Sequence, residues 1–184
     1  LDVLVADSFQ LGDVAIDASI GAEESTITQV GGFTEDRSLF FMKPSLAMSF
    51  SPSEQSQWRL RALRDVGQLD LQDFVSGADL GDVELALGNP ELSPETTVTV
   101  DLSYERRGEG FGIGTVTLFH DWVDDVNDLL PLTGQLEVPG NIGSGTRAGV
   151  RGEITLPLDA IGLANARMDA SARWQTSSVT DPLT

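Results

Sequence analysis

Apolar and polar residues alternate at every second position over much of this sequence. Between 96 and 106, the apolar residues Val98, Val100, Leu102 and Tyr104 alternate with threonine, aspartate, serine and glutamate, and the segments 14–21 and 166–175 repeat the pattern. Helical spacing of three and four residues does not fit these segments. Because successive side chains on a strand point to opposite faces of a sheet, each segment predicts a strand with one apolar and one polar face.

Eight segments follow this pattern and predict eight strands: 1–8, 14–28, 40–51, 57–68, 96–106, 112–126, 147–156 and 166–176. Most of them are 10 or more residues long, whereas a typical soluble strand has roughly 5–6. The connections alternate between short ones (10–13, 52–56, 107–111 and 157–165) and long ones (29–39, 69–95 and 127–146). Short turns on one side and long loops on the other are typical of outer-membrane β-barrels.

The predicted fold class is therefore all-β, an antiparallel up-and-down meander of about eight strands that is part of a transmembrane outer-membrane β-barrel. A soluble β-sandwich also alternates apolar and polar residues, so a soluble sandwich that binds a ligand such as a carbohydrate is the alternative. Trp58, Trp122 and Trp174 each fall near a predicted strand end, which is typical of a barrel's aromatic girdle. Pro44 predicts either a bulge or a division of the segment 40–51 into two shorter strands.

Composition narrows the function classes. The 184 residues include 29 acidic and 11 basic ones, a net charge of −18, so the chain lacks the basic surface that nucleic-acid binding requires. The absence of cysteine excludes disulfides, thiol catalysis and thiolate metal sites. No stretch approaches the roughly 18 consecutive apolar residues of a spanning helix. The first residues have no basic segment and no long apolar core, so we expect no signal peptide.

From residue 57 onward, several motifs resemble the barrel of TonB-dependent receptors. Asn89-Pro90-Glu91-Leu92-Ser93-Pro94-Glu95 resembles the N-P-x-L-x-P-E signature that opens a barrel strand in that family. Asn141-Ile142-Gly143, followed by residues 147–153, is similar to the family's asparagine-glycine loop and the strand after it. Gly67-Gln68-Leu69-Asp70 with Asp73-Phe74-Val75 is similar to a subgroup of receptor-like barrels, and Val179-Thr180-Asp181-Pro182 resembles the family's sequences as well.

The resemblance covers about two-thirds of the chain through motifs and the first third only through the alternating pattern. It implies that residues 1–184 are a partial β-barrel without a plug domain, an excerpt of the later half of a barrel of about 22 strands. It also implies a place in the bacterial cell outer membrane and energy-coupled uptake of a scarce nutrient such as a siderophore. A barrel that serves only as an anchor or adhesin is a third possibility.

The partners implied by the resemblance are outer-membrane lipid and lipopolysaccharide, the plug domain and TonB in the parent protein, and a small-molecule ligand that the sequence does not identify. We expect no enzyme activity, no cofactor, no metal and no nucleic acid. The sequence assigns no catalytic residue and leaves the ligand-binding residues unknown.

Two features that resemble catalytic or phosphate-binding motifs have simpler interpretations. His120, the only histidine, shares a predicted face with Val116, Leu118 and Trp122, so an interfacial position is favoured over catalysis. The alternating glycines do not have G-x-G-x-x-G spacing and are not followed by a helix, so they predict a tight turn instead of a phosphate cradle. These glycines are Gly108, Gly110, Gly112 and Gly114.

Charged residues gather in three sets. The first set could form a calcium site or a solvated acidic rim, and the rim is favoured because EF-hand spacing is missing. It consists of Asp121, Asp124, Asp125 and Asp128. For the segment 69–95, a loop kept soluble by charge is favoured over an external loop that meets a ligand or divalent ions. Its acids are Asp70, Asp73, Asp79, Asp82, Glu84, Glu91 and Glu95. The third set consists of arginines on the polar faces, for which pairing with acids across strands is favoured over contact with a plug or substrate. The arginines are Arg59, Arg61, Arg64, Arg147, Arg151, Arg167 and Arg173, and the acids are Asp101, Glu105, Glu153 and Asp169.

Overall fold

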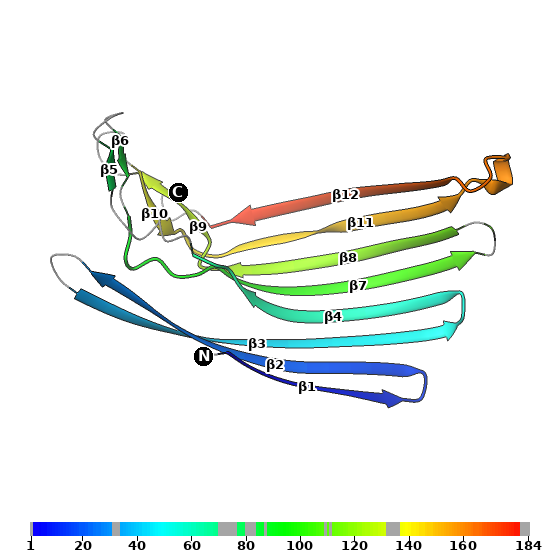
Figure 1. Cartoon of the computed structure of the whole chain (residues 1–184), viewed down its shortest axis with the longest axis horizontal. Helices are drawn as coiled ribbons and strands as arrows, with labels where there is room; N and C mark the ends of the chain where they lie inside the picture. The colour runs from blue at the N-terminus through cyan, green and yellow to red at the C-terminus, as the bar shows by residue number, and fades with distance from the viewer. Residues whose placement is uncertain are drawn as a thin grey trace. The chain divides into compact units, whose positions relative to one another are not determined.

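The computed structural model describes residues 2–30, 34–69, 77–79, 84–86, 88–108, 110, 112–131 and 137–180. Eight long strands form one sheet in the order β1-β2-β3-β4-β7-β8-β11-β12, so each lies beside the next long strand along the chain (Figure 1). The strands are β1 (Asp2–Leu11), β2 (Val14–Val30), β3 (Thr34–Ser53), β4 (Ser56–Val66), β7 (Thr96–Gly108), β8 (Gly112–Asp124), β11 (Gly145–Pro157) and β12 (Arg167–Val179). The predicted antiparallel meander of eight strands is confirmed.

β3 extends well beyond the segment that the sequence predicts, whereas β2 exceeds its predicted segment by two residues. β2 continues to Val30 and β3 begins at Thr34, and their pairing runs without a shift from Ser25↔Leu39 to Val30↔Thr34. The predicted long loop 29–39 is therefore wrong. Residues 34–38, which lengthen β3, are all polar, and this hides the alternation, although threonine is β-branched and suits a pleated strand.

The other two predicted long loops each contain a hairpin that the sequence did not indicate. Within 69–95, β5 (Gly77–Asp79) pairs with β6 (Glu84–Ala86). Within 127–146, β9 (Asn127–Pro131) pairs with β10 (Glu137–Asn141). Each hairpin forms a two-stranded sheet of its own.

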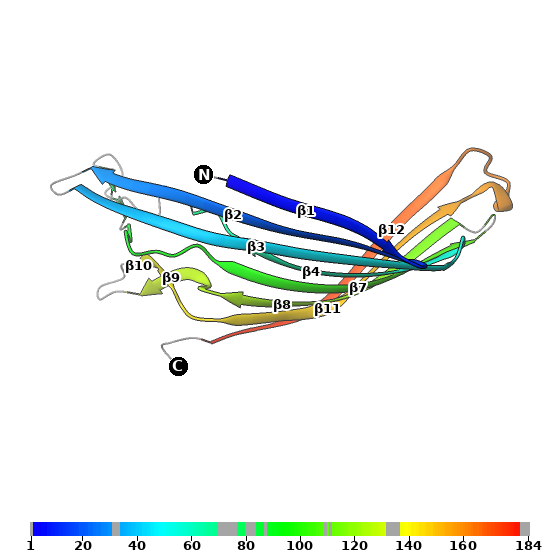
Figure 2. The same cartoon turned by 90° about the horizontal axis from the view of Figure 1, so that it is seen from below.

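Contacts within the chain define two compact units. Unit 1 comprises Leu1–Arg64, Thr99–His120 and Ala148–Thr176, and unit 2 comprises Asp65–Val98, Asp121–Arg147 and Ser177–Thr184. In unit 1, four connections join β1 to β2, β3 to β4, β7 to β8 and β11 to β12 at the same end of the strands (Figures 1 and 2). The last of them includes the 3-10 helix η2 (Asp159–Ile161). No helix in the described part of the chain is long and apolar enough to cross a membrane.

The turn between β1 and β2 shows why glycine is needed there. Leu11 pairs with Val14, so Gly12 and Asp13 are the two central residues of the hairpin turn. Gly12 has φ 60, whereas Asp13 is not among the residues with positive φ. A two-residue turn with positive φ only at its first central position favours glycine there, because glycine has no Cβ to clash.

The strand register gathers the apolar residues of unit 1 on one face of the sheet. Ile20 on β2 lies opposite Val5 on β1 and Pro44 on β3, and Phe50 on β3 lies opposite Trp58 on β4. The Trp58 ring also lies beside Tyr104 of β7, with 4.6 Å between ring centroids. Large side chains on this apolar face are exposed, including Phe40, Met42, Leu46, Phe50, Leu60, Leu102, Val116, Leu118, Met168 and Trp174.

The apolar face has no protein cover in the described part of the chain. Buried hydrophobic residues there are limited to Val66, Leu92 and Phe119. A β-sandwich would bury its apolar face against a second sheet, so the sandwich alternative is wrong. A contiguous exposed apolar surface of this kind marks contact with lipid or with another protein.

Pro44 neither bulges nor divides β3. It continues the regular register with β2 opposite Ile20, and the irregularity in the β3–β4 pairing lies between Phe50 and Ser53 instead. The β3–β4 ladder starts at Ser45↔Leu63, one residue beyond the proline. There Arg64 Nη1 donates to the Met42 carbonyl at 3.0 Å. Pro44 therefore lies just outside the β3–β4 ladder, so β4 needs no backbone N–H from this position. A sheet tolerates proline at such a position.

The tryptophans follow the girdle prediction in part. Trp58 and Trp122 lie close to an end of β4 and of β8. Trp174 lies in the middle part of β12, because this strand continues to Val179. All three indole side chains are exposed.

Candidate functional site

The polar face of unit 1 carries a network of cross-strand pairs. Arg61 on β4 forms an ion pair with Asp101 on β7, whose side chain is 8% exposed. Farther along the sheet, Ser103 and Thr117 share a hydrogen bond of 2.9 Å between β7 and β8. Between β2 and β3, Lys43 Nζ pairs with Glu23 Oε2 at 2.5 Å. Buried polar groups such as the Asp101 carboxylate and the Thr117 hydroxyl require partners, and the neighbouring strands supply them.

The predicted pairing of arginines with carboxylates is confirmed for some residues and wrong for others. Arg61 pairs with Asp101 across strands, whereas Arg167 pairs with Asp169 within β12. Arg147 pairs with Asp121 at 2.7 Å, and Glu105 pairs with Arg107. Hydrogen bonds to uncharged groups are formed by Arg59, to Gln57 Oε1, and by Arg64, to the Met42 carbonyl.

Phe119 is an apolar residue on the polar face, and the sequence analysis did not single it out. It is 5% exposed. The guanidinium carbons of Arg151 and Arg173 lie 5.5 and 4.7 Å from its ring centroid. The sequence does contain one sign of its role. Phe119 is an aromatic residue that falls between the apolar positions Leu118 and Trp122 of the alternating pattern and therefore on the opposite face.

Gly149 on β11 makes room for this ring. A Cβ at Gly149 would lie 2.9 Å from Phe119 Cζ and would collide with the Trp174 carbonyl of β12. The aromatic ring therefore covers a strand glycine on the neighbouring strand, an arrangement that stabilises glycine in sheets. The result is an aromatic platform with two guanidinium groups beside it.

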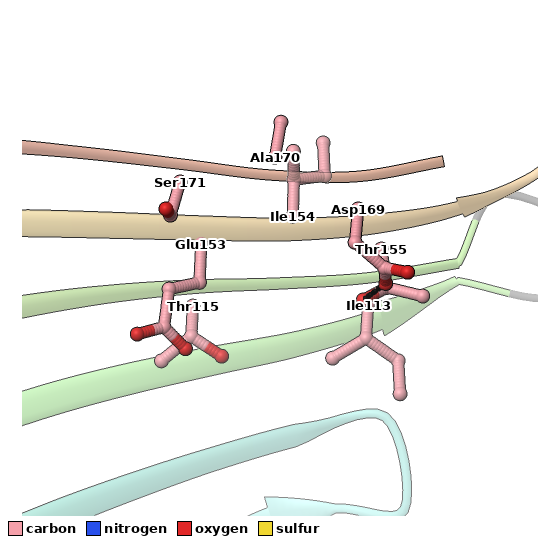
Figure 3. Close-up of a pocket in the computed structure, with 8 residues that line it drawn as sticks. All are labelled: Ile113, Thr115, Glu153, Ile154, Thr155, Asp169, Ala170 and Ser171. Carbon is pink, nitrogen blue, oxygen red and sulfur yellow. Dashed lines mark hydrogen bonds between the residues drawn. The ribbon is translucent and has the colours of Figure 1, made fainter. Parts of the chain in front are cut away.

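A shallow pocket lies on the polar face at the beginning of β12, with a volume of about 490 Å³. Thr115 and Ile113 line it from β8, and Glu153 and Thr155 line it from β11 (Figure 3). Thr155 Oγ1 donates to Asp169 Oδ1 at 2.7 Å. Ile154 and Ala170 point to the opposite side of the sheet (Figure 3). The pocket offers carboxylates and hydroxyls, which suit a polar ligand better than an apolar one.

The acidic set at the end of β8 is divided by the structure. Asp121 is 4% exposed and accepts a hydrogen bond from Arg147 Nε, so it does not belong to a solvated rim as predicted. Asp124, Asp125 and Asp128 are exposed, which agrees with the rim. Among the described residues, no group of three or more histidine or acidic side chains could hold a metal ion.

His120 lies on the predicted face of β8, and its interfacial position stays a prediction. His120 is partly exposed, and the strand alternation puts it on the same face of β8 as Leu118 and Trp122. Gly110 and Gly112 have φ 73 and 84, as a tight turn requires. A Cβ at Gly112 would also collide with the Thr155 carbonyl, so this position needs glycine for space as well.

In unit 2, the two best-matching motifs of the sequence analysis contact each other. Asn141 Oδ1 accepts a hydrogen bond from Ser93 N at 2.8 Å, and Asn141 Nδ2 donates to Ser93 O at 2.9 Å. Asn89 Nδ2 donates to the Pro139 carbonyl at 3.0 Å. Leu92, between these two contacts, is 1% exposed. The N-P-x-L-x-P-E segment is thus a structural clamp on the β9–β10 hairpin.

The acidic segment 69–95 is described only in part. Asp70, Asp73 and Asp82 lie outside the described residues. Glu91 N donates to Asn89 Oδ1, and the Glu95 carbonyl accepts from Gly67 N at 2.7 Å. The two interpretations of this segment, a loop kept soluble by its charge and an external loop that meets a ligand, both stay predictions, and the sequence favours the first.

Comparison with known proteins identifies relatives of this fold. A family described as TonB dependent receptor-like, beta-barrel matches residues 3–183. No curated protein matches the sequence. Among solved structures, the chain is similar to the siderophore receptor PirA from Pseudomonas aeruginosa, with a TM-score of 0.73 and 16% identity over 96% of this chain and 31% of that one.

Two further structures show the same fold. The copper transporter OprC has a TM-score of 0.71 and 11% identity over 96% of this chain and 28% of its own. The FrpB iron transporter from Neisseria meningitidis has a TM-score of 0.66 and 10% identity over 96% of this chain and 25% of its own. The chain therefore spans less than a third of the length of each of these proteins.

Proposed function

Since the chain belongs to the TonB dependent receptor-like β-barrel family, we propose that it forms part of the wall of an outer-membrane receptor that takes up a scarce nutrient, such as a siderophore. The family is one of transport receptors, and we propose no chemical reaction for this chain. In the proposed parent protein, a plug domain and TonB couple uptake to the proton-motive force.

The two-faced sheet is the observation that carries this proposal. On one face, residues such as Phe40, Leu118 and Trp174 are exposed side by side with other apolar residues. On the other face, charged residues such as Asp101 are buried in ion pairs. In an outer-membrane barrel, strands alternate in this way between a lipid-facing and an interior face. We therefore assign the apolar face to lipid and the polar face to the interior of the barrel.

The first experiment is an uptake assay in the organism that carries the gene. Cells with and without the gene are grown under iron limitation and supplied with radiolabelled ferric siderophores of several chemical types. We expect the gene deletion, or a proton uncoupler, to reduce accumulation of at least one of them to background. Unchanged uptake of every siderophore would exclude the siderophore proposal, and uptake that is insensitive to the uncoupler would exclude the energy coupling.

A further inference from the structure

Arg151 and Arg173 lie directly opposite each other on the polar face of β11 and β12. Two contacts define this register: Thr155 bonds to Asp169 across the two strands, and a Cβ on Gly149 would lie 2.9 Å from Gln175 Cα. Antiparallel pairing that joins these residues also joins Arg151 to Arg173. Directly opposite residues have Cβ atoms roughly 4.5–5.5 Å apart, and like charges in such pairs repel each other.

No carboxylate of the described residues neutralises this pair. The ion pairs found there involve Lys43, Arg61, Arg107, Arg147 and Arg167, each with an acid. Glu153 lies two residues along β11 and lines the neighbouring pocket, yet it forms no ion pair within 4.0 Å. In a chain with 29 acids and 11 bases, two opposed arginines without an acid are unexpected.

The Phe119 ring holds both guanidinium groups near one point. The ring is buried and fixed over Gly149, and each guanidinium carbon lies within 5.5 Å of its centroid. Cation–π contact of this kind favours a cation close to the ring face, but it supplies no negative charge. Among the described residues, nothing covers these two side chains fully: Arg173 is exposed and Arg151 is partly exposed.

We propose that Arg151 and Arg173, held against Phe119, form a binding site for a small oxyanion, a carboxylate or phosphate group on a soluble molecule. Each guanidinium presents a planar fork of N–H donors that matches two oxygens of such a group. One oxyanion between the two forks would cancel their repulsion and form charge-assisted hydrogen bonds with both. This inference concerns binding alone and holds whether or not the protein transports a siderophore.

The experiment uses the purified full-length protein in neutral detergent micelles, with inorganic phosphate as the probe. The width of the phosphorus-31 NMR signal is measured as phosphate is added to the protein, and a chloride salt keeps the ionic strength constant. We expect saturable binding at one site, with affinity reduced about tenfold or more by Arg151→Gln and by Arg173→Gln, since loss of one charged pair of hydrogen bonds has that order of effect. Acetate should compete with phosphate.

Arg59→Gln is the matched control. Arg59 lies on β4, and its side chain donates to Gln57 at 2.9 Å, so the variant removes the same charge elsewhere. It should bind phosphate as the wild type does, and Arg151→Lys should bind with intermediate affinity because it keeps the charge without the fork. Heat-modifiable electrophoretic mobility verifies that each barrel is folded. The proposal is overturned if the wild type binds phosphate no better than a variant that carries both Arg151→Gln and Arg173→Gln. It is also overturned if Arg59→Gln weakens phosphate binding as much as Arg151→Gln or Arg173→Gln does.

Discussion

Asn141 satisfies both backbone polar groups of Ser93, with Oδ1 2.8 Å from its nitrogen and Nδ2 2.9 Å from its oxygen. The two residues are 48 positions apart in the sequence. The same amide also donates to the Asp125 carbonyl at 2.8 Å. One side chain thus connects the segment before β7 to the end of β8 and to the β9–β10 hairpin.

Replacing Asn141 should loosen this clamp. Asn141→Ala leaves the part-buried backbone groups of Ser93 without these partners, so we expect a loss of about 1–3 kcal/mol in the free energy of unfolding. Asn141→Asp keeps the acceptor for Ser93 N but places an anion against the Ser93 and Asp125 carbonyls, so it should be no more stable than the alanine variant. Urea unfolding of the full-length protein in lipid vesicles measures both. An alanine variant as stable as the wild type would contradict the clamp.

Charge on the two faces of the sheet should have opposite consequences. Leu118 is 50% exposed on the apolar face of β8, so Leu118→Arg should cost roughly 2–4 kcal/mol if it lies near the bilayer midplane. Ser171 is exposed on the polar face of β12, and Ser171→Arg should change stability by about 0.5 kcal/mol or less. The same vesicle assay compares them. Equal effects at the two positions would disprove the assignment of the apolar face to lipid.

Two glycines of β11 should respond differently to alanine. A Cβ at Gly149 would meet Phe119 and the Trp174 carbonyl, whereas a Cβ at Gly152 would meet nothing within 4 Å. Overpacking of a tight site costs about 1–3 kcal/mol, so Gly149→Ala should be destabilised by this amount. Gly152→Ala should be neutral or slightly stabilised, since alanine restricts the unfolded chain. A neutral Gly149→Ala would show that the ring does not need this space.

The Arg61–Asp101 pair should be asymmetric. The Asp101 side chain is 8% exposed and the Arg61 side chain 51%. Arg61→Gln leaves a buried carboxylate without its guanidinium, which should cost about 1–3 kcal/mol. Asp101→Asn leaves a half-exposed arginine that water can solvate, so it should cost less, and the double variant should resemble Asp101→Asn. Unfolding of all four proteins gives the coupling energy, and additive costs would mean that the two groups act independently.

The alternating pattern was sufficient to predict the sheet because strand geometry alone imposes it. Where both faces are polar, as in residues 34–38 of β3, the pattern disappears although the strand continues. The effect of Pro44 was not predictable for a related reason. Its effect depends on where the neighbouring strand stops, and that is a property of the pair of strands, not of the segment.

The candidate site was less predictable because it depends on register. The sequence indicated that Arg151 and Arg173 lie on polar faces, but their alignment follows from the pairing of β11 with β12. The role of Phe119 was not predictable because its burial depends on Gly149, which lies beside it on a neighbouring strand. The clamp between Asn141 and Ser93 likewise joins residues far apart in sequence.

The strictly sequential strand order has a consequence for how the sheet assembles. Neighbouring strands of the eight-stranded sheet are always consecutive long strands of the chain, and closing a short loop costs less conformational entropy than closing a long one. The β1–β2 pair closes through two residues, Gly12 and Asp13, whereas 69–95 separates β4 from β7. We therefore expect the short-turn pairs to form early and the β4–β7 and β8–β11 seams late. Shortening 69–95 should then accelerate folding more than any change at Gly12 and Asp13, because contacts of long sequence separation limit the folding rate.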